Sequence, residues 1–232
     1  MALPRRIPTW WTQVRLIVDK DLRIELRTGE VVTTSTFFAV LIVVMASFSL
    51  YSGAASKRLV VAAVVWLAIA FAAVLSLGRA WQRERDEGAL TGVVVSPIAA
   101  SALFAGKATG LMLFLFAIEL VVIPLACLLF AVDLLEAGPG FLLMALFATP
   151  GIAATGTLFG AMTVRTRARD LMLAVVLFPL LSPVLLSSVA GTRELLGGAS
   201  LAELGDYLRL MAIFDLVFVA GGLALFGLLL ED

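Results

Sequence analysis

Six long runs with almost no charged residue are the feature that most constrains how this chain can fold. They cover residues 31–56, 59–78, 108–132, 137–164, 171–192 and 210–230. Each is long enough to cross about 30 Å of hydrocarbon as a helix, which takes roughly 20 residues. In lipid every backbone polar group needs a partner inside the protein, and a helix supplies one. The sequence therefore predicts an all-α membrane protein with six transmembrane helices, built as a single membrane domain over residues 1–232.

The composition agrees with this prediction. Of the 232 residues, 62% are hydrophobic and only 15% are charged, whereas soluble domains are typically about 45–50% apolar. A globule of this size could not remove so much apolar surface from water, so the chain needs an apolar solvent.

Several kinds of chemistry are excluded by the residues that are absent. The sequence has no histidine and one cysteine, Cys127, which lies in an apolar run. Imidazole ligation of a metal or haem iron and Ser–His or Cys–His catalysis are therefore excluded. The segment around Gly106-Lys107 lacks the earlier glycine and the following Ser or Thr of a phosphate-binding loop. We expect no catalytic residue, no metal site and no enzymatic activity, with any ATP hydrolysis in a partner subunit.

Lysine and arginine are unequally distributed among the segments that connect the predicted spans. If both termini face the cytoplasm, thirteen of the 17 basic residues lie on the cytoplasmic side. Cytoplasmic segments of membrane proteins are enriched in these residues, so the pattern predicts an N-in, C-in topology. In the connector after residue 164, Arg165, Arg167 and Arg169 would act as cytoplasmic topology anchors.

Residues 9–30 precede the first predicted span and have an amphipathic pattern. One helical face collects apolar residues, namely Trp11, Val14, Val18, Leu22 and Leu26. The opposite face collects polar residues, namely Gln13, Lys20, Arg23 and Arg27. This pattern favours an interfacial helix along the cytoplasmic leaflet. The alternative is a polar cytoplasmic tail.

Two acidic residues interrupt predicted spans. Glu119 lies near the middle of its run, where a charge costs roughly 2.5–3.5 kcal/mol on insertion scales. It is either a substrate contact or proton-relay site, or a hydrogen-bonded carboxyl that holds helices together. Asp215 is the sixth residue of its run, about 9 Å from the outer end at helical rise, which favours an acid facing the interface. The two would form a pair if both faced one bundle interior.

The outer end of the fifth span carries signals of irregular structure. Pro179 and Pro183 are predicted to kink or break the helix. Ser200 and Glu203 fit a capping box that would open a short outer helix through about Tyr207. Residues 179–209 therefore leave open an irregular or partly re-entrant arrangement.

The connector between the second and third spans, residues 79–97, is dense in charge of both signs. A lipid-headgroup patch would be mainly basic, so mixed charge favours a short helix that docks another cytoplasmic protein. The alternative is a solvated loop that only satisfies topology.

Together these features resemble the ABC-2-type exporter permeases, and more narrowly the CcmB family, the haem exporter protein B of cytochrome c maturation. The resemblance covers nearly the whole chain. Its motifs occur in three groups: Lys20-Asp21-Leu22, Glu25-Leu26-Arg27 and Phe37-Phe38; Glu84, Glu87-Gly88-Ala89-Leu90, Pro97 and Gly106-Lys107; and Thr149-Pro150, Gly156, Thr163-Val164-Arg165, Arg167, Phe178-Pro179-Leu180 and Pro183.

The resemblance implies a permease subunit in the cytoplasmic (inner) membrane, energised by the ATPase CcmA. It makes residues 79–97 a coupling helix, with ATPase-docking positions at Glu84, Asp86, Glu87, Gly88 and Leu90. It further implies two copies in the ABC core, association with CcmC and CcmD, and ATP-driven release of the haem-loaded chaperone CcmE. A permease for another cargo, or a proton-coupled carrier using Glu119 and Asp215, are the alternative functions.

The same resemblance makes haem a possible transported or handled cargo. Because the chain has no histidine, we expect no tightly bound cofactor. A weakly held porphyrin without an iron ligand, in a groove open to the side of the protein, remains compatible with the sequence.

Overall fold

The structure is a computed structural model that describes residues 8–49, 54–86, 98–163 and 169–231. Within these ranges the chain forms seven helices and no strand. They are α1 (Trp10–Thr28), α2 (Glu30–Ser49), α3 (Ala54–Asp86), α5 (Ala100–Phe130), α6 (Leu134–Thr163), α7 (Arg169–Leu196) and α8 (Gly205–Glu231). All except α1 are long and apolar enough to cross a membrane. The predicted all-α fold with six membrane-spanning helices is confirmed.

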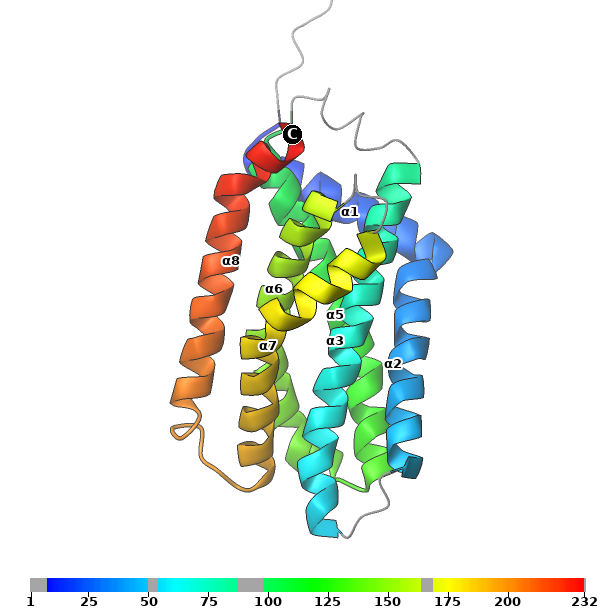
Figure 1. Ribbon diagram of the computed structural model, residues 1–232, viewed down its shortest axis with the longest axis vertical. Helices are drawn as coiled ribbons and strands as arrows, with labels where there is room; N and C mark the ends of the chain where they lie inside the picture. The colour runs from blue at the N-terminus through cyan, green and yellow to red at the C-terminus, as the bar shows by residue number, and fades with distance from the viewer. Residues whose placement is uncertain (1–7, 50–53, 87–97, 164–168, 232) are drawn as a thin grey trace, which may run out of the picture.

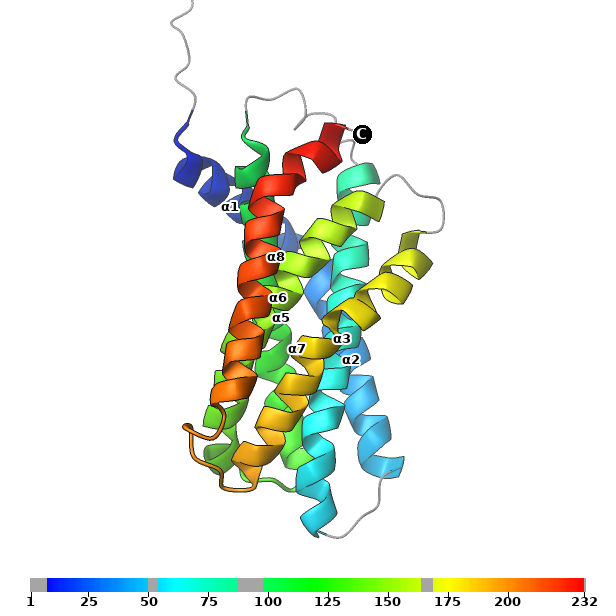
Figure 2. The same ribbon diagram turned by 60° about the vertical axis from the view of Figure 1, so that its left-hand side comes forward.

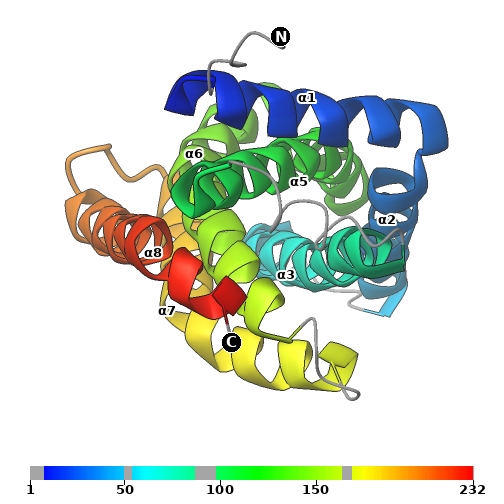
Figure 3. The ribbon, with the colours of Figure 1, turned by 90° about the horizontal axis from the view of Figure 1, so that it is seen from above.

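The six long helices form a bundle, and α1 lies across one end of it (Figure 1). Figure 3 looks down on this end and shows α1 beside α5 and leading into α2. We call it the α1 end. Helices α3, α6 and α8 finish there, and α2, α5 and α7 begin there. The first and last described helices therefore share one end of the bundle, and the side of the membrane that this end faces stays a prediction.

Hydropathy predicts where the six membrane-spanning helices lie, but it does not predict the residues at which they begin and end. Helix α3 continues past residue 78 to Asp86, so residues 79–86 of the predicted coupling helix belong to α3. Helix α5 begins at Ala100, eight residues before position 108, and α2 ends at Ser49, short of position 56. Hydropathy marks the hydrocarbon-spanning segment, whereas a helix can continue beyond it into the polar headgroup region.

Small residues on α6 bring the central helices close together. A Cβ at Gly160 would collide with the indole ring of Trp81 on α3, and a Cβ at Gly156 would lie 3.4 Å from Leu77. Trp81 and Leu77 are themselves buried. Helices α3 and α6 therefore form the centre of the bundle, where small residues allow close backbone approach.

Helix α7 runs without interruption through Pro179 and Pro183. Figures 1 and 2 show that it changes direction along its length. Neither proline breaks the helix, and Ser182 Oγ donates a hydrogen bond of 2.7 Å to the Pro179 carbonyl. Freed carbonyls near a proline in a membrane helix are commonly satisfied by serine or threonine in this way.

The predicted short helix from residue 200 to about 207 is wrong. Residues 201–204 form turns, and α8 begins directly at Gly205. Ser200 and Glu203 do contact each other, with 2.7 Å between the hydroxyl and the carboxylate. This hydrogen bond, and a second from the Ser200 backbone, lower the pKa of the Glu203 carboxyl. The pair stabilises a turn between two membrane helices, because too few residues remain before α8 for a separate helix.

Candidate functional site

Helix α1 is fixed to the start of α5 by polar side chains. The Gln13 amide oxygen accepts a hydrogen bond of 2.9 Å from the backbone N–H of Ala99, just before α5. The Trp10 indole donates to Ser101 Oγ at 3.1 Å. Gln13 is only 6% exposed, so its predicted place on a solvent-facing polar side is wrong. The reason is that the first N–H groups of α5 need acceptors, and α1 supplies one.

A partly buried ion pair joins the same two helices about two turns further along. Lys107 Nζ lies 2.9 Å from Asp21 Oδ2 and 3.0 Å from Oδ1. The two side chains are only 11% and 13% exposed. Ile17 packs closely on Gly106, where a Cβ would fall 2.7 Å from it. The sequence analysis did not predict this pair, because nothing in a linear sequence joins Lys107 to a residue 86 positions earlier.

The corner between α1 and α2 is closed by a carboxylate. Glu25 is buried, and its two oxygens accept the backbone N–H groups of Val31 at 3.2 Å and Val32 at 2.7 Å. Gly29 adopts a left-handed conformation, φ 62°, that ends α1. A carboxylate on the first turn of a helix also matches the positive end of its dipole. The angle between α1 and α2 is therefore set by specific contacts.

Most of the predicted docking site lies outside the described residues. Glu87, Gly88 and Leu90 are not described, and for Glu84 and Asp86 only the helical backbone is. The structure does place both ends of this connector at the α1 end, where α3 finishes and α5 begins (Figure 1). Because α1 holds the first residues of α5, the connector is flanked by a rigidly positioned helix.

The predicted topology anchors are also largely outside the described part of the chain. Arg165 and Arg167 are not described, and Arg169 is described only as the first backbone position of α7. Their connector starts and finishes at the α1 end, with the end of α6 on one side and the start of α7 on the other.

Glu119 links α5 to α6 in the interior. Its side chain is 3% exposed, and Thr149 Oγ1 donates a hydrogen bond of 2.6 Å to Glu119 Oε1. The second oxygen, Oε2, is buried and has no hydrogen-bond partner among the described residues. The contact fits the interpretation of a carboxyl that holds helices together. The partner, Thr149, was visible in the sequence only as part of a family motif.

Asp215 contacts the opposite side of the same helix. Its carboxylate lies against Gly151 of α6, where a Cβ would collide with it. Thr149 and Gly151 are two positions apart, which is about 200° around a helix. The two acids therefore meet different faces of α6 and do not form the pair that the sequence left open. Because α8 begins at Gly205, five residues before the predicted span, Asp215 lies about 15 Å along the helix from its first residue.

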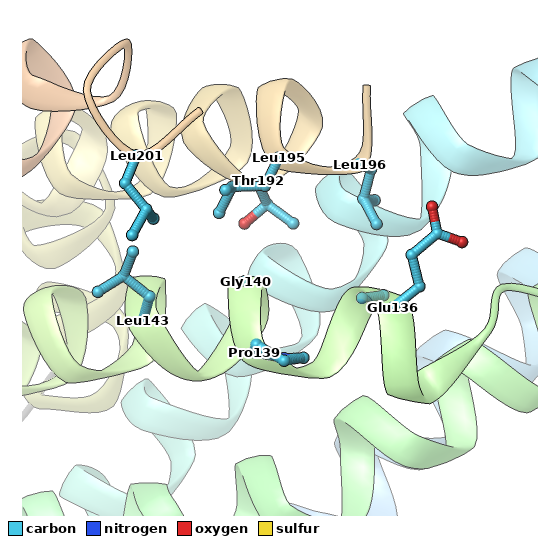
Figure 4. A pocket seen from close by; sticks show the side chains of 9 residues that line it. Glu136, Pro139, Gly140, Leu143, Thr192, Leu195, Leu196 and Leu201 are labelled. Atoms are coloured by element: carbon cyan, nitrogen blue, oxygen red, sulfur yellow. The ribbon is translucent and has the colours of Figure 1, made fainter. Parts of the chain in front are cut away.

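A hollow at the other end of the bundle, about 330 Å³ in volume, lies between α6, α7 and the turn after it (Figure 4). Its walls are mainly leucines, among them Leu143, Leu195 and Leu201. The Thr192 hydroxyl on its wall already accepts a hydrogen bond of 2.9 Å from the Trp66 indole. No charged group other than Glu136 lines this hollow among the described residues, so we assign no site to it.

The fold and these contacts define the class of the protein: a multi-pass, all-helical membrane protein in which α1 is fixed across one end of the bundle. The chain belongs to the CcmB family, whose model, described as CcmB protein, matches residues 12–227.

Three relatives share this family likeness over most of their length. Heme exporter protein B of Bradyrhizobium diazoefficiens is 29% identical over 193 residues, covering 81% of this chain and 84% of that protein. Heme exporter protein B of Pseudomonas aeruginosa is 30% identical over 196 residues, covering 79% of this chain and 82% of that protein. The Rhodobacter capsulatus protein of the same name is 28% identical over 182 residues.

Proposed function

We propose that this chain is the transmembrane permease subunit of an ABC transporter complex that handles haem during cytochrome c maturation. Membership of the CcmB family supports the proposal, and so does the printed name of its relatives, heme exporter protein B. The chain carries no phosphate-binding loop, so the energy would come from a separate ATPase subunit. On this account the chain is a transporter subunit and not an enzyme.

The α1 end is the proposed contact surface for that ATPase. The observation that carries this is the fixed position of α5, the helix that follows the connector at 79–97: α1 is bonded to the start of α5 through Gln13 and through the Asp21–Lys107 ion pair. A force applied at the connector would therefore act on α1 and α5 together. With the predicted N-in, C-in topology this end would face the cytoplasm, where ATP is available.

The partners and location follow from the family resemblance and are part of the proposal. The ATPase would be CcmA, with two permease copies in the ABC core of a cytoplasmic-membrane complex. CcmC and CcmD would associate with it, and ATP hydrolysis would release the haem-loaded chaperone CcmE.

Charge reversal in the connector tests the docking claim. Changing Glu84, Asp86 and Glu87 to lysine should abolish co-purification of the ATPase subunit with the tagged permease, because like charges would then oppose the dock. The matched control reverses three exposed acids at the other end of the bundle, Glu194, Glu203 and Asp206. Equal recovery of the ATPase with both triple variants would remove the proposed docking surface.

A proton-coupled carrier that uses Glu119 and Asp215 is the second candidate. One observation favours it: Glu119 is buried in the interior with Oε2 lacking a hydrogen-bond partner among the described residues. Glu119→Gln keeps the shape and the Thr149 contact but cannot exchange a proton. A carrier of this kind would lose cytochrome c assembly in that variant, while the ABC permease would retain it. Assembly is measured by haem staining of membranes that hold wild-type levels of the protein.

A further inference from the structure

An aromatic groove on the side of the bundle has no role in the contacts described so far. It lies between α2 and α3 on the half nearer the α1 end, with a volume of about 740 Å³. Phe37 and Phe38 of α2 and Phe71 of α3 line it. Phe38 and Phe71 meet edge to face with ring centroids 6.2 Å apart. Phe71 also packs on Phe178 of α7 at 4.8 Å, so three helices share one aromatic cluster.

The upper rim of the groove is polar. Thr34, Arg79 and Gln82 line it there. Arg79 Nη1 lies 3.6 Å from the Glu30 carboxylate, and both side chains are partly exposed. An exposed ion pair of that length contributes little stability. The Arg79 side chain is 36% exposed, so the outer nitrogens of its guanidinium can reach an anionic group at this rim.

The two parts of the groove lie at different depths. Glu30 is the first residue of α2, and Phe37 follows seven positions later, about 10 Å further along the helix. Helix α3 runs in the other direction, with Phe71 about 12 Å below Arg79. Phe37 is 69% exposed, so the aromatic part opens sideways towards lipid. The groove thus suits a molecule with a flat apolar body and an anionic edge at the membrane surface.

We propose that this groove binds haem that enters sideways from the bilayer, held by stacking and charge without a protein ligand to its iron. The inference rests on the proposed function, which supplies the cargo. A porphyrin is a flat aromatic ring with two carboxylates on one edge, and it matches the phenylalanines below and Arg79 above. The groove volume falls in the range of about 300–1,000 Å³ typical of small-molecule sites. A phospholipid offers a phosphate for Arg79, but its two acyl chains offer no flat face for the aromatic rings.

The absence of an iron ligand gives the proposal a distinctive consequence. No histidine occurs in the sequence, and the described residues that line the groove include no Cys, Met or Tyr. Recognition therefore depends on the ring and its carboxylates. Metal-free protoporphyrin IX should bind with nearly the same affinity as haem, and its dimethyl ester should bind more weakly.

The test is a titration of the full-length chain in neutral-lipid nanodiscs with protoporphyrin IX, followed by porphyrin fluorescence. Arg79→Gln should weaken binding of the free acid roughly tenfold, the value of one charge-assisted hydrogen bond, and leave the dimethyl ester unaffected. Phe37→Ala should weaken both ligands. The controls are Arg209→Gln and Phe48→Ala, which alter exposed residues elsewhere. Because Arg79 and Phe37 are themselves partly or largely exposed, these variants should fold, and gel filtration checks this.

Three results would overturn the groove assignment. The first is binding of haem but not of metal-free porphyrin, which would mean ligation of iron elsewhere. The second is porphyrin affinity unchanged by Arg79→Gln and Phe37→Ala. The third is displacement of porphyrin by anionic lipid with a dependence on Arg79, which would make the groove a lipid site. The proposed function is tested separately, by the loss of covalent c-type cytochromes in cells that lack the chain. Failure of the groove assignment can therefore be distinguished from failure of the proposed function.

Discussion

Asp21 and Lys107 illustrate how single residues position an element of this protein. Their charged groups lie 2.9 Å apart with little exposure to solvent. A pair with so little exposure costs desolvation on both sides, so it often adds little net stability compared with apolar side chains. Removal of one partner breaks this contact between α1 and α5, although Asp21 keeps a second cation, Lys20, whose Nζ lies 3.3 Å from Asp21 Oδ1. The pair therefore specifies where α1 sits on α5.

We predict that Lys107→Met or Asp21→Asn alone lowers the free energy of unfolding by about 1–3 kcal/mol, the usual cost of losing one partner of a charged hydrogen bond with little exposure. The double variant Asp21→Leu/Lys107→Met should recover most of this loss, because neither charge of the pair remains. Denaturant titration in detergent measures both. Arg23→Gln is the control, since Arg23 pairs with Asp19 at an exposed position and should cost less than about 1 kcal/mol. Single variants no less stable than this control would contradict the prediction.

At the scale of elements, α8 is the helix that contacts the bundle through the fewest buried residues. Met211, Gly222 and Phe226 are buried, whereas long stretches of its surface are exposed apolar side chains. Gly222 lies against the ring of Phe104 on α5, and a Cβ there would collide with that ring. The absence of a side chain at Gly222 therefore permits this close approach of α8 to α5.

Gly222→Ala should accordingly lower the free energy of unfolding by about 1–3 kcal/mol, the usual cost of inserting a methyl group into a packed contact. Its neighbour offers a matched control. Gly221 has open space around its missing Cβ, so Gly221→Ala should be neutral or stabilise the helix by up to about 1 kcal/mol. Comparison of the two variants in the same denaturant titration checks the prediction. Equal effects would show that Phe104 does not limit this contact.

The elements also show what periodicity and hydropathy can predict. The six spans were identifiable because lipid imposes a minimum apolar length on each of them. The inward position of Gln13 on α1 could not be predicted in this way. Gln13 faces inward because its amide oxygen accepts an N–H group at the start of α5. The turn at Ser200 was mistaken for a short helix because a capping-box pattern also occurs in turns.

At the scale of the whole molecule, the sequence predicted the fold class and the family, but not which helices meet. Glu119 was recognisable as costly in a membrane, yet its partner Thr149 lies 30 positions away. The aromatic groove combines residues of α2 and α3 with Phe178 of α7, and no local pattern joins them. Each CcmB family motif could be recognised in the sequence, but only the folded chain shows which residues those motifs contact.

The proposed function requires this chain to be an indispensable permease of cytochrome c maturation. The most direct measurement is haem staining of covalently attached c-type cytochromes in cells that lack the chain. The account predicts that all of them disappear, that the wild-type chain restores them, and that the Glu84, Asp86 and Glu87 reversal does not, although it accumulates in the membrane. Normal covalent cytochromes in the absence of the chain would contradict it and would favour a permease for another cargo.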